Sequence, residues 1–225
     1  MELSHVVPWG RSFREYRKMF CLTDSDLKKS ILGCGDGPAS FNSGLTSMGG
    51  AVISADPVYA FSAIQLQARI AEVYAEIIPK MEATQSQYIW ESIPSVDALG
   101  QVRMDAMLRF LTDYEQGRQQ GRYVECSLPE LPFNNKQFDL ALCSHYLFLY
   151  SSQVSLVQHL DSVFELLRVA REVRIYPLVT LDGSPSPYLQ KVTTALKQQG
   201  ADVQLLSSAY VFQKGATHTL VIREQ

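Results

Sequence analysis

ILGCGDGPASF at residues 31–41 and AVISADP at residues 51–57 are the two ends of the stretch that decides the fold. A short apolar run enters a cluster of glycines, an amphipathic segment leaves it, and a second apolar run ends at Asp56. This order of strand, glycine turn, helix and strand is half of a nucleotide-binding α/β unit. The glycines let the backbone turn tightly beside a ligand, and the carboxylate of Asp56 can accept hydrogen bonds from both hydroxyls of a ribose.

The spacing of these glycines narrows the choice of nucleotide. They stand at positions 33, 35 and 37, and Pro38 occupies the position where a dinucleotide-binding fingerprint has its third glycine. No lysine follows the loop, as a triphosphate-binding loop requires. The residues therefore disfavour both of these phosphate-binding modes.

The hydrophobic pattern predicts alternating strands and helices along the chain. The predicted strands are residues 30–33, 51–56, 122–126, 138–144, 172–178, 203–212 and 218–223. The predicted helices are residues 12–22, 38–48, 61–81 and 95–119, one that Ser151 and Ser152 cap, and residues 188–199. Helices between strands predict parallel pairing, whereas the short connection QKGAT before the last strand predicts an antiparallel hairpin.

From this order we expect one domain over residues 1–225: an α/β, Rossmann-like three-layer sandwich with a seven-stranded, mostly parallel sheet. A helical arm occupies residues 1–29. A helical insertion follows the second strand at about residues 58–121 and is expected to cover the carboxyl ends of the strands. Its first helix is predicted to bury one face, made of Ile64, Ala68, Ala71, Ala75 and Ile78.

Composition limits the partners. The net charge is -3, the pI is about 5.8, and no cluster of Lys and Arg is present, so we expect neither nucleic acid nor a membrane as a partner. The four cysteines show no paired spacing, and the N-terminus lacks the pattern of a signal peptide; both favour the cytoplasm. The histidines have no metal-ligand spacing. A small molecule is the expected partner, and the oligomeric state stays open, with a homodimer as one arrangement.

These motifs resemble class I S-adenosylmethionine-dependent methyltransferases. Residues 31–57 resemble the first motif of that superfamily, and LPF at 131–133 followed by FDL at 138–140 resembles a signature of its small-molecule enzymes. The runs WGRSFREYRKMF, ILGCGDGPASFN, LPELPF and LCSHYLFLYS are similar to a bacterial group of methyltransferases without an assigned substrate. The antiparallel C-terminal strand also agrees with the superfamily.

The resemblance implies S-adenosylmethionine as the cofactor. It places Ser127 and the backbone N–H of Leu128 at the adenine, and Ser144 and His145 beside the transferred methyl group. The residues expected to bind the cofactor are Gly33, Cys34, Gly35, Asp36, Gly37, Asp56, Pro57, Ser127, Leu128 and Ser144.

Two positions depart from the family pattern. Many relatives have an acid two residues before the first glycine, where it helps to hold the cofactor's ammonium group, but Ile31 stands there in this chain. Asp36 or a backbone carbonyl is left to take that role. Residues 169–172 read VARE where relatives commonly have a turn of two glycines.

His145 is the candidate catalytic residue. A neutral imidazole can take a proton from an incoming hydroxyl or amine, although a histidine in this loop can instead only shape the pocket. Methyl transfer from a sulfonium is an in-line displacement, and alignment alone can supply much of its rate. The candidate substrate contacts, each of which can also be a packing residue, are Tyr16, Trp90, Tyr146 and Tyr150. Glu91, Arg103 and Asp105 either select a polar substrate or lie on solvated helix faces.

The expected function is methyl transfer from S-adenosylmethionine to an O, N or C nucleophile of a small molecule. The first alternative is a non-catalytic protein that binds S-adenosylmethionine or S-adenosylhomocysteine and acts through a partner. A nicotinamide-dependent oxidoreductase is the second alternative, which Pro38 and the LPF and FDL runs disfavour.

Overall fold

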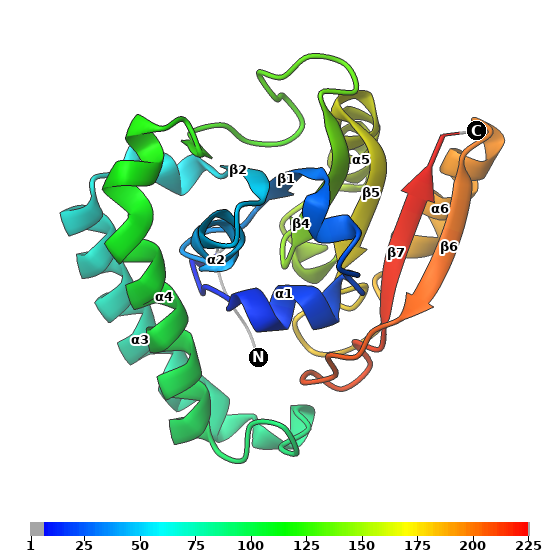
Figure 1. Cartoon of the computed structure of the whole chain (residues 1–225). Helices are drawn as coiled ribbons and strands as arrows, with labels where there is room; N and C mark the ends of the chain where they lie inside the picture. The colour runs from blue at the N-terminus through cyan, green and yellow to red at the C-terminus, as the bar shows by residue number, and fades with distance from the viewer. Residues whose placement is uncertain (1–6, 225) are drawn as a thin grey trace.

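A seven-stranded sheet forms the centre of the computed structural model, which describes residues 7–224 (Figure 1). Its order is β3-β2-β1-β4-β5-β7-β6. The strands are β1 (Ser30–Cys34), β2 (Ala51–Ala55), β3 (Tyr123–Val124), β4 (Phe138–Ser144), β5 (Ala170–Tyr176), β6 (Asp202–Ser207) and β7 (His218–Arg223). Neighbours from β3 to β5 pair in parallel, and β7 is antiparallel to both β5 and β6. The predicted mostly parallel sheet and its C-terminal hairpin are confirmed. Residues 1–6 of the predicted arm lie outside the described residues.

Helices cover both faces of this sheet, so the predicted three-layer, Rossmann-like arrangement is confirmed. Figure 1 shows α1 (Phe13–Met19) and α2 (Phe41–Ser47) on one face, with α5 (Leu156–Val169) and α6 (Leu189–Gln198) on the other. The order of the strands reverses between β1 and β4, and the connections from these two strands leave in opposite directions. Such a reversal opens a crevice at the carboxyl ends of the strands.

The insertion after β2 is a pair of long helices, α3 (Ala63–Ala83) and α4 (Val96–Gln119). The predicted helices exist, but the predicted buried face of the first is wrong. Ile64 is 80% exposed. The buried face is instead Leu66, Ile70, Val73, Ile77 and Met81. Both stripes have helical spacing, and the helix turns the bulkier one inward because large side chains gain more from burial.

The segment that joins α3 to α4 packs against the loop that follows β6 (Figure 1). The backbone N–H of Ile89 donates to the carbonyl of Phe212 at 2.8 Å, and Lys214 donates to Gln87 at 2.9 Å. The predicted long last hairpin is therefore wrong in one respect. The sixth strand ends at Ser207, and the backbone of residues 212–214 in the following loop pairs with the insertion rather than with β7.

Further boundaries differ from the predictions: β5 is Ala170–Tyr176 rather than residues 172–178, and α1 ends at Met19 rather than at residue 22. The cap of α5 and the length of β3 also differ. Ser155 caps α5, with its hydroxyl accepting from the backbone of Gln158 and the Gln158 side chain accepting in return. Ser151 does not cap this helix, since its hydroxyl donates to the carbonyl of Phe148 at 2.7 Å. The third strand has only the residues Tyr123–Val124, because the chain turns away toward the proline loop directly afterwards.

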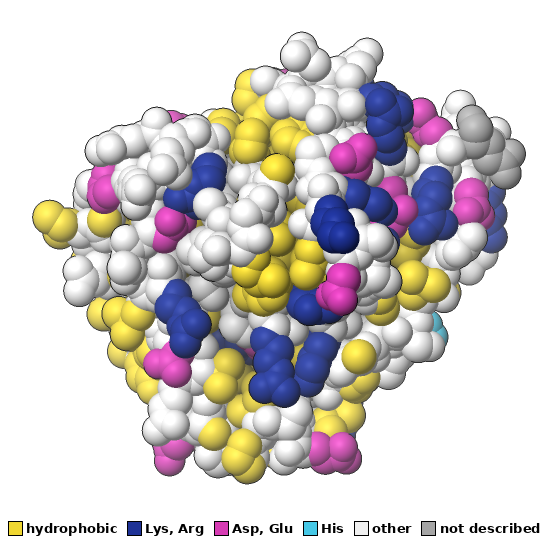
Figure 2. All heavy atoms as spheres, viewed as in Figure 1, with side chains coloured by type: hydrophobic (Ala, Val, Ile, Leu, Met, Phe, Trp, Pro, Cys, Tyr) yellow, Lys and Arg dark blue, Asp and Glu magenta, His cyan; other side chains and the backbone are white. Residues whose placement is uncertain are grey.

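Arg174 of β5 ties the N-terminal arm to the sheet. Its guanidinium, 6% exposed, lies 2.6 Å from Glu172 and 3.2 Å from Asp26. It also donates to the carbonyls of Phe20 and Cys21, which directly follow α1, at 2.7 and 3.2 Å. Figure 2 shows both basic and acidic side chains on the face that carries α1.

We predict that Arg174→Ala destabilises the protein by about 2–3 kcal/mol, because Asp26 and Glu172 lose the guanidinium that they share and keep only Lys29 and Arg223 as cationic partners. Urea unfolding followed by circular dichroism measures the loss. Arg171→Ala on the same strand is the matched control, since the Arg171 side chain is 67% exposed. The control is expected to stay within about 0.5 kcal/mol of wild type. Equal losses in the two variants would contradict the tethering role.

Candidate functional site

A cavity of about 330 Å³ lies where β1, β2 and β4 end. It collects most of the residues that the sequence predicts for the cofactor. Those that line it are Cys34, Gly35, Asp36, Gly37, Asp56, Pro57, Ser127, Leu128 and Ser144. The parallel strands bring these segments together because their carboxyl ends meet at one edge of the sheet. Gly35 and Gly37 have φ angles of +68° and +52°, a left-handed backbone that favours glycine.

Gly33 is the one predicted cofactor residue that does not line this larger cavity. A Cβ at this position would lie 1.9 Å from Oδ2 of Asp36. The glycine therefore makes room for the Asp36 carboxylate, which accepts hydrogen bonds from Tyr16 Oη and Ser54 Oγ, both at 2.7 Å. Burial raises the pKa of Asp36 to about 6, although these two hydrogen bonds oppose the shift.

Asp56 holds the glycine loop from the end of β2. Its carboxylate accepts from the backbone N–H of Gly37 at 2.8 Å and from that of Val58 at 2.9 Å. Tyr59 braces the same loop by donating to the carbonyl of Gly37 at 2.8 Å. Burial raises the pKa of Asp56 to about 6. Each carboxylate oxygen keeps a lone pair for a further donor, such as a hydroxyl.

A second cavity of about 90 Å³ adjoins the first. The two share Val7, Trp9, Arg11 and His145. The smaller one is enclosed by α3, α4, the end of β5 and the loop after β6. Its other polar or aromatic lining residues are Tyr88, Arg103, Tyr150, Tyr176, Tyr210, Phe212 and Gln213. The insertion thus covers the carboxyl ends of β4 and β5, as predicted.

His145 stands at the boundary between the two cavities. Its φ angle is 50°, and its backbone N–H donates to the carbonyl of Tyr176 at 2.8 Å. Its Nδ1 lies 3.0 Å from Ser144 Oγ. Burial, with Arg11 and Arg103 nearby, keeps the pKa of this imidazole well below its usual value. The ring is therefore neutral at pH 7, and its protonation beside two guanidiniums is unfavourable.

Arg103 of the insertion is buried, with 1% of its side chain exposed, so its expected solvated position is wrong. It pairs with Glu15 at 2.6 Å and donates to Tyr210 Oη at 3.0 Å. The helix α4 turns it inward because Glu15 of α1 supplies the opposite charge that a buried guanidinium needs. Glu91 and Asp105 are both exposed, as their solvated reading predicts.

The four candidate substrate residues separate in space. Tyr150 lines the smaller cavity and Tyr146 the larger one. Tyr16 is fully buried beside Asp36 and lines neither cavity, and Trp90 packs on Tyr88 and Phe212 outside both. The sequence analysis missed Trp9, Arg11, Tyr176 and Tyr210. Their signal was weak, because nothing in the local pattern shows that the arm and the last loop reach the same cavity.

Within residues 7–224 no group of His, Cys, Asp and Glu side chains could hold a metal ion. Across the same residues, none of the helices combines the length and the apolar character needed to span a membrane.

No family model matches this chain. An uncharacterised protein of the archaeon Methanocaldococcus jannaschii is 28% identical over 224 residues, which cover 99% of this chain and 98% of that protein. The sequence resemblance pointed to a bacterial group, whereas this relative is archaeal. Likeness to this chain is therefore not confined to bacteria.

One similar solved structure is that of a putative S-adenosylmethionine-dependent methyltransferase of Methanococcus maripaludis. Its TM-score is 0.48 and its sequence identity is 9%, and the match covers 95% of this chain and 83% of that one. Magnesium protoporphyrin IX methyltransferase of Synechocystis, with bound cofactor, has a TM-score of 0.45 and 11% identity, covering 90% and 73% of the two chains. A methyltransferase of Aquifex aeolicus has a TM-score of 0.42 and 14% identity, covering 87% and 80%.

The raised pKa of Asp36 predicts a pH effect on stability. A carboxyl whose pKa rises on folding stabilises the fold while it is protonated, and this contribution is lost as the pH climbs from about 4 through 6. Asp36→Asn removes the effect. We expect the variant to gain stability relative to wild type between pH 4 and pH 7, by up to about 3 kcal/mol.

Urea unfolding at a series of pH values measures this difference. The exposed Asp161→Asn on α5 is the control for the loss of one carboxylate. Parallel curves for wild type and Asp36→Asn would show that the Asp36 carboxyl has no raised pKa.

Proposed function

We propose that this chain is a methyltransferase that binds S-adenosylmethionine in the larger cavity and transfers its methyl group to a small molecule in the smaller one. The observation that carries the proposal is the meeting of the two cavities at His145, at the carboxyl ends of β1, β2 and β4. One cavity suits a nucleoside with a cationic tail, and the other is a separate space for an acceptor.

The larger cavity supplies the groups that the cofactor needs. Asp56 has lone pairs free for the two ribose hydroxyls, and its burial strengthens such hydrogen bonds. Ser127 and Leu128 also line this cavity, and the family resemblance implies that they contact the adenine. The carboxylate of Asp36 offers the ammonium group a partner in place of the acid that Ile31 replaces. A cation there would also lower the pKa of Asp36 and so favour its ionised form.

S-adenosylmethionine, when bound, would supply an electrophilic methyl group for transfer to the acceptor. The chain's contribution is alignment and the exclusion of water. Trp9, Arg11 and His145 wall the boundary between the cavities, where the two reactants must meet.

His145 suits a positioning role better than that of a general base. Its imidazole is neutral, so it can accept a hydrogen bond from an acceptor hydroxyl or amine. It holds a transferred proton poorly, because an imidazolium would face the guanidiniums of Arg11 and Arg103.

We assign residues 1–225 to one methyltransferase domain that includes the arm and the insertion, and we place it in the cytoplasm, where its free cysteines stay reduced.

Calorimetry tests the cofactor. We predict that the protein binds S-adenosylhomocysteine and not NAD. Asp56→Asn weakens this binding by at least about tenfold, because it replaces a charged hydrogen-bond acceptor of the ribose with a neutral amide. Asp161→Asn, with an exposed side chain on α5, is the matched control and is expected to bind as wild type does.

Tight binding of NAD with no response to S-adenosylhomocysteine would overturn the proposal in favour of an oxidoreductase. Turnover of a labelled methyl donor across a panel of small metabolites separates an enzyme from a binding protein that acts through a partner. Turnover that Asp56→Asn leaves unchanged would remove the ribose role of Asp56.

A further inference from the structure

The smaller cavity carries an excess of positive charge. Arg11 and Arg103 line it, and no Asp or Glu does among the described residues. The larger cavity is the reverse, since Asp36 and Asp56 line it and Arg11 is its one Lys or Arg among those residues. The two adjoining spaces therefore suit ligand groups of opposite charge.

Glu15 is the acid nearest to this positive charge, and its hydrogen-bonding capacity is already used. Its Oε1 accepts from Arg103 at 2.6 Å and from Tyr210 Oη at 2.8 Å. Its Oε2 accepts from the backbone N–H and the hydroxyl of Ser12, the N-cap residue of α1, at 2.8 and 2.9 Å. The arginines lower the pKa of Glu15 to about 2, so it is ionised at neutral pH. One carboxylate thus faces two guanidiniums.

Among residues 7–224, Arg11 forms no ion pair with a carboxylate, whereas Arg103 pairs with Glu15. The Nε of Arg11 is buried and has no hydrogen-bond partner within the same residues. Its Nη1 donates to a backbone carbonyl, that of Trp9. Burial and the neighbouring Arg103 lower the pKa of Arg11, which reflects the cost of a second positive charge there. A buried guanidinium is stabilised best by an oxyanion that meets its fork of N–H groups.

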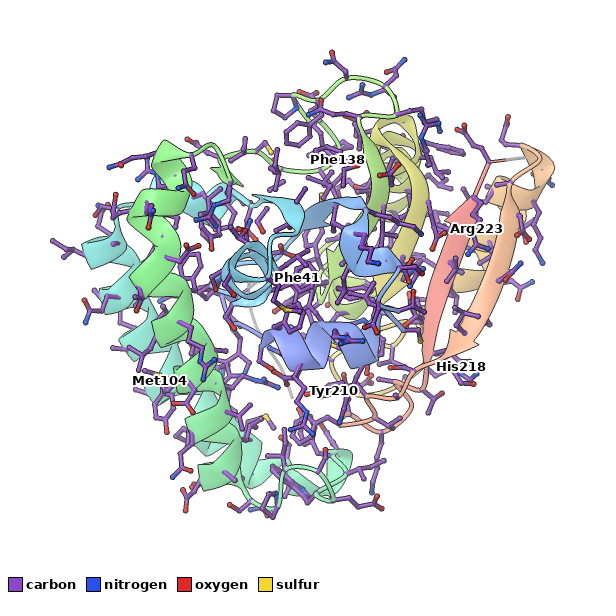
Figure 3. All side chains as sticks on the ribbon, viewed as in Figure 1. Phe41, Met104, Phe138, Tyr210, His218 and Arg223 are labelled. Carbon is purple, nitrogen blue, oxygen red and sulfur yellow. The ribbon has the colours of Figure 1, made fainter. Side chains whose placement is uncertain are left out.

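Most of the other lining residues are apolar or aromatic. Trp9, Tyr88, Tyr176, Tyr210 and Phe212 surround the space (Tyr210 is labelled below α1 in Figure 3). The volume of about 90 Å³ admits only a small molecule. Aromatic faces bind flat carbon skeletons well, and this lining complements the single charged group.

We propose that the acceptor is a small organic acid whose carboxylate pairs with Arg11, with its flat apolar part against these aromatic rings. This inference rests on the proposed function, because it takes the smaller cavity as the acceptor side of a methyl-transfer site. The carboxylate anchors the acceptor and leaves another atom of it free to face the cofactor.

A carboxylate at Arg11 has two sources, since this residue lines both cavities: the acceptor, or the methionine part of the cofactor. The position of Arg103 favours the acceptor. Arg103 lines only the smaller cavity, so the positive potential that it shares with Arg11 is centred there.

Calorimetry with benzoate and its neutral analogue benzamide tests the anion site, using the full chain with and without S-adenosylhomocysteine in phosphate-free buffer at pH 7.5. We expect benzoate to bind at least about tenfold more tightly than benzamide, and Arg11→Gln to remove that preference. Arg14→Gln is the matched control, because Arg14 is an exposed residue of the same arm. Melting curves verify that each variant folds. If a variant does not fold, the ratio of benzoate affinity to benzamide affinity in the wild type still tests the anion site.

A second arm separates the two sources of carboxylate. S-adenosylhomocysteine carries a carboxylate, and 5′-methylthioadenosine lacks it. Arg11→Gln is expected to change the affinity of both by less than about threefold, a shift of under 1 kcal/mol. A large loss for S-adenosylhomocysteine alone would assign Arg11 to the cofactor and overturn the proposal.

Three other outcomes are decisive. The anion site would be overturned if benzoate and benzamide bound equally well. It would also be overturned if benzoate, phenylacetate and acetate all failed to bind at millimolar concentration. Binding of benzoate that depends on Arg11 in a protein that does not bind S-adenosylhomocysteine would support the anion site while the proposed function fails.

Discussion

Two carboxylates are buried side by side at the carboxyl ends of β1 and β2, and the local structure is built to hold them. Asp36 accepts hydrogen bonds from Tyr16 and Ser54, and Asp56 accepts from the backbone of Gly37 and Val58. Burial raises the pKa of both carboxyls, and the charge of Asp56 adds to the rise for Asp36. Gly33 leaves room for the Asp36 carboxylate, Gly37 donates its N–H to Asp56, and Tyr16 of the arm donates to Asp36.

The N-terminal arm connects this loop to the rest of the molecule. Tyr16 on one side of α1 contacts Asp36, and Glu15 next to it pairs with Arg103 of the insertion and Tyr210 of the last loop. Arg174 then fastens the end of the arm to the central sheet. One short helix therefore aligns the larger cavity with the smaller one. This explains why Trp9 and Arg11, which precede α1, line both cavities.

The opposite charges of the two cavities separate the tasks of the site. In the proposed function, the side lined by Asp36 and Asp56 takes the cationic nucleoside, and the side lined by Arg11 and Arg103 takes the anionic acceptor. His145 lies between them, and burial together with Arg11 and Arg103 lowers the pKa of its imidazole; an anionic ligand would screen the two guanidiniums. Its role therefore depends on what occupies the smaller cavity.

The sequence by itself determined the sheet, its hairpin and most of the larger cavity, because these follow from local signals. Apolar runs, glycine spacing and Asp56 each act over a few residues, and parallel strands bring their carboxyl ends together without further information. Tertiary structure alone decided the smaller cavity and the inward face of α3. That cavity draws on the arm, the insertion, β5 and the last loop, which lie far apart in the chain. Arg103 reads as a surface residue on its own helix, and only the approach of Glu15 from α1 makes its burial favourable.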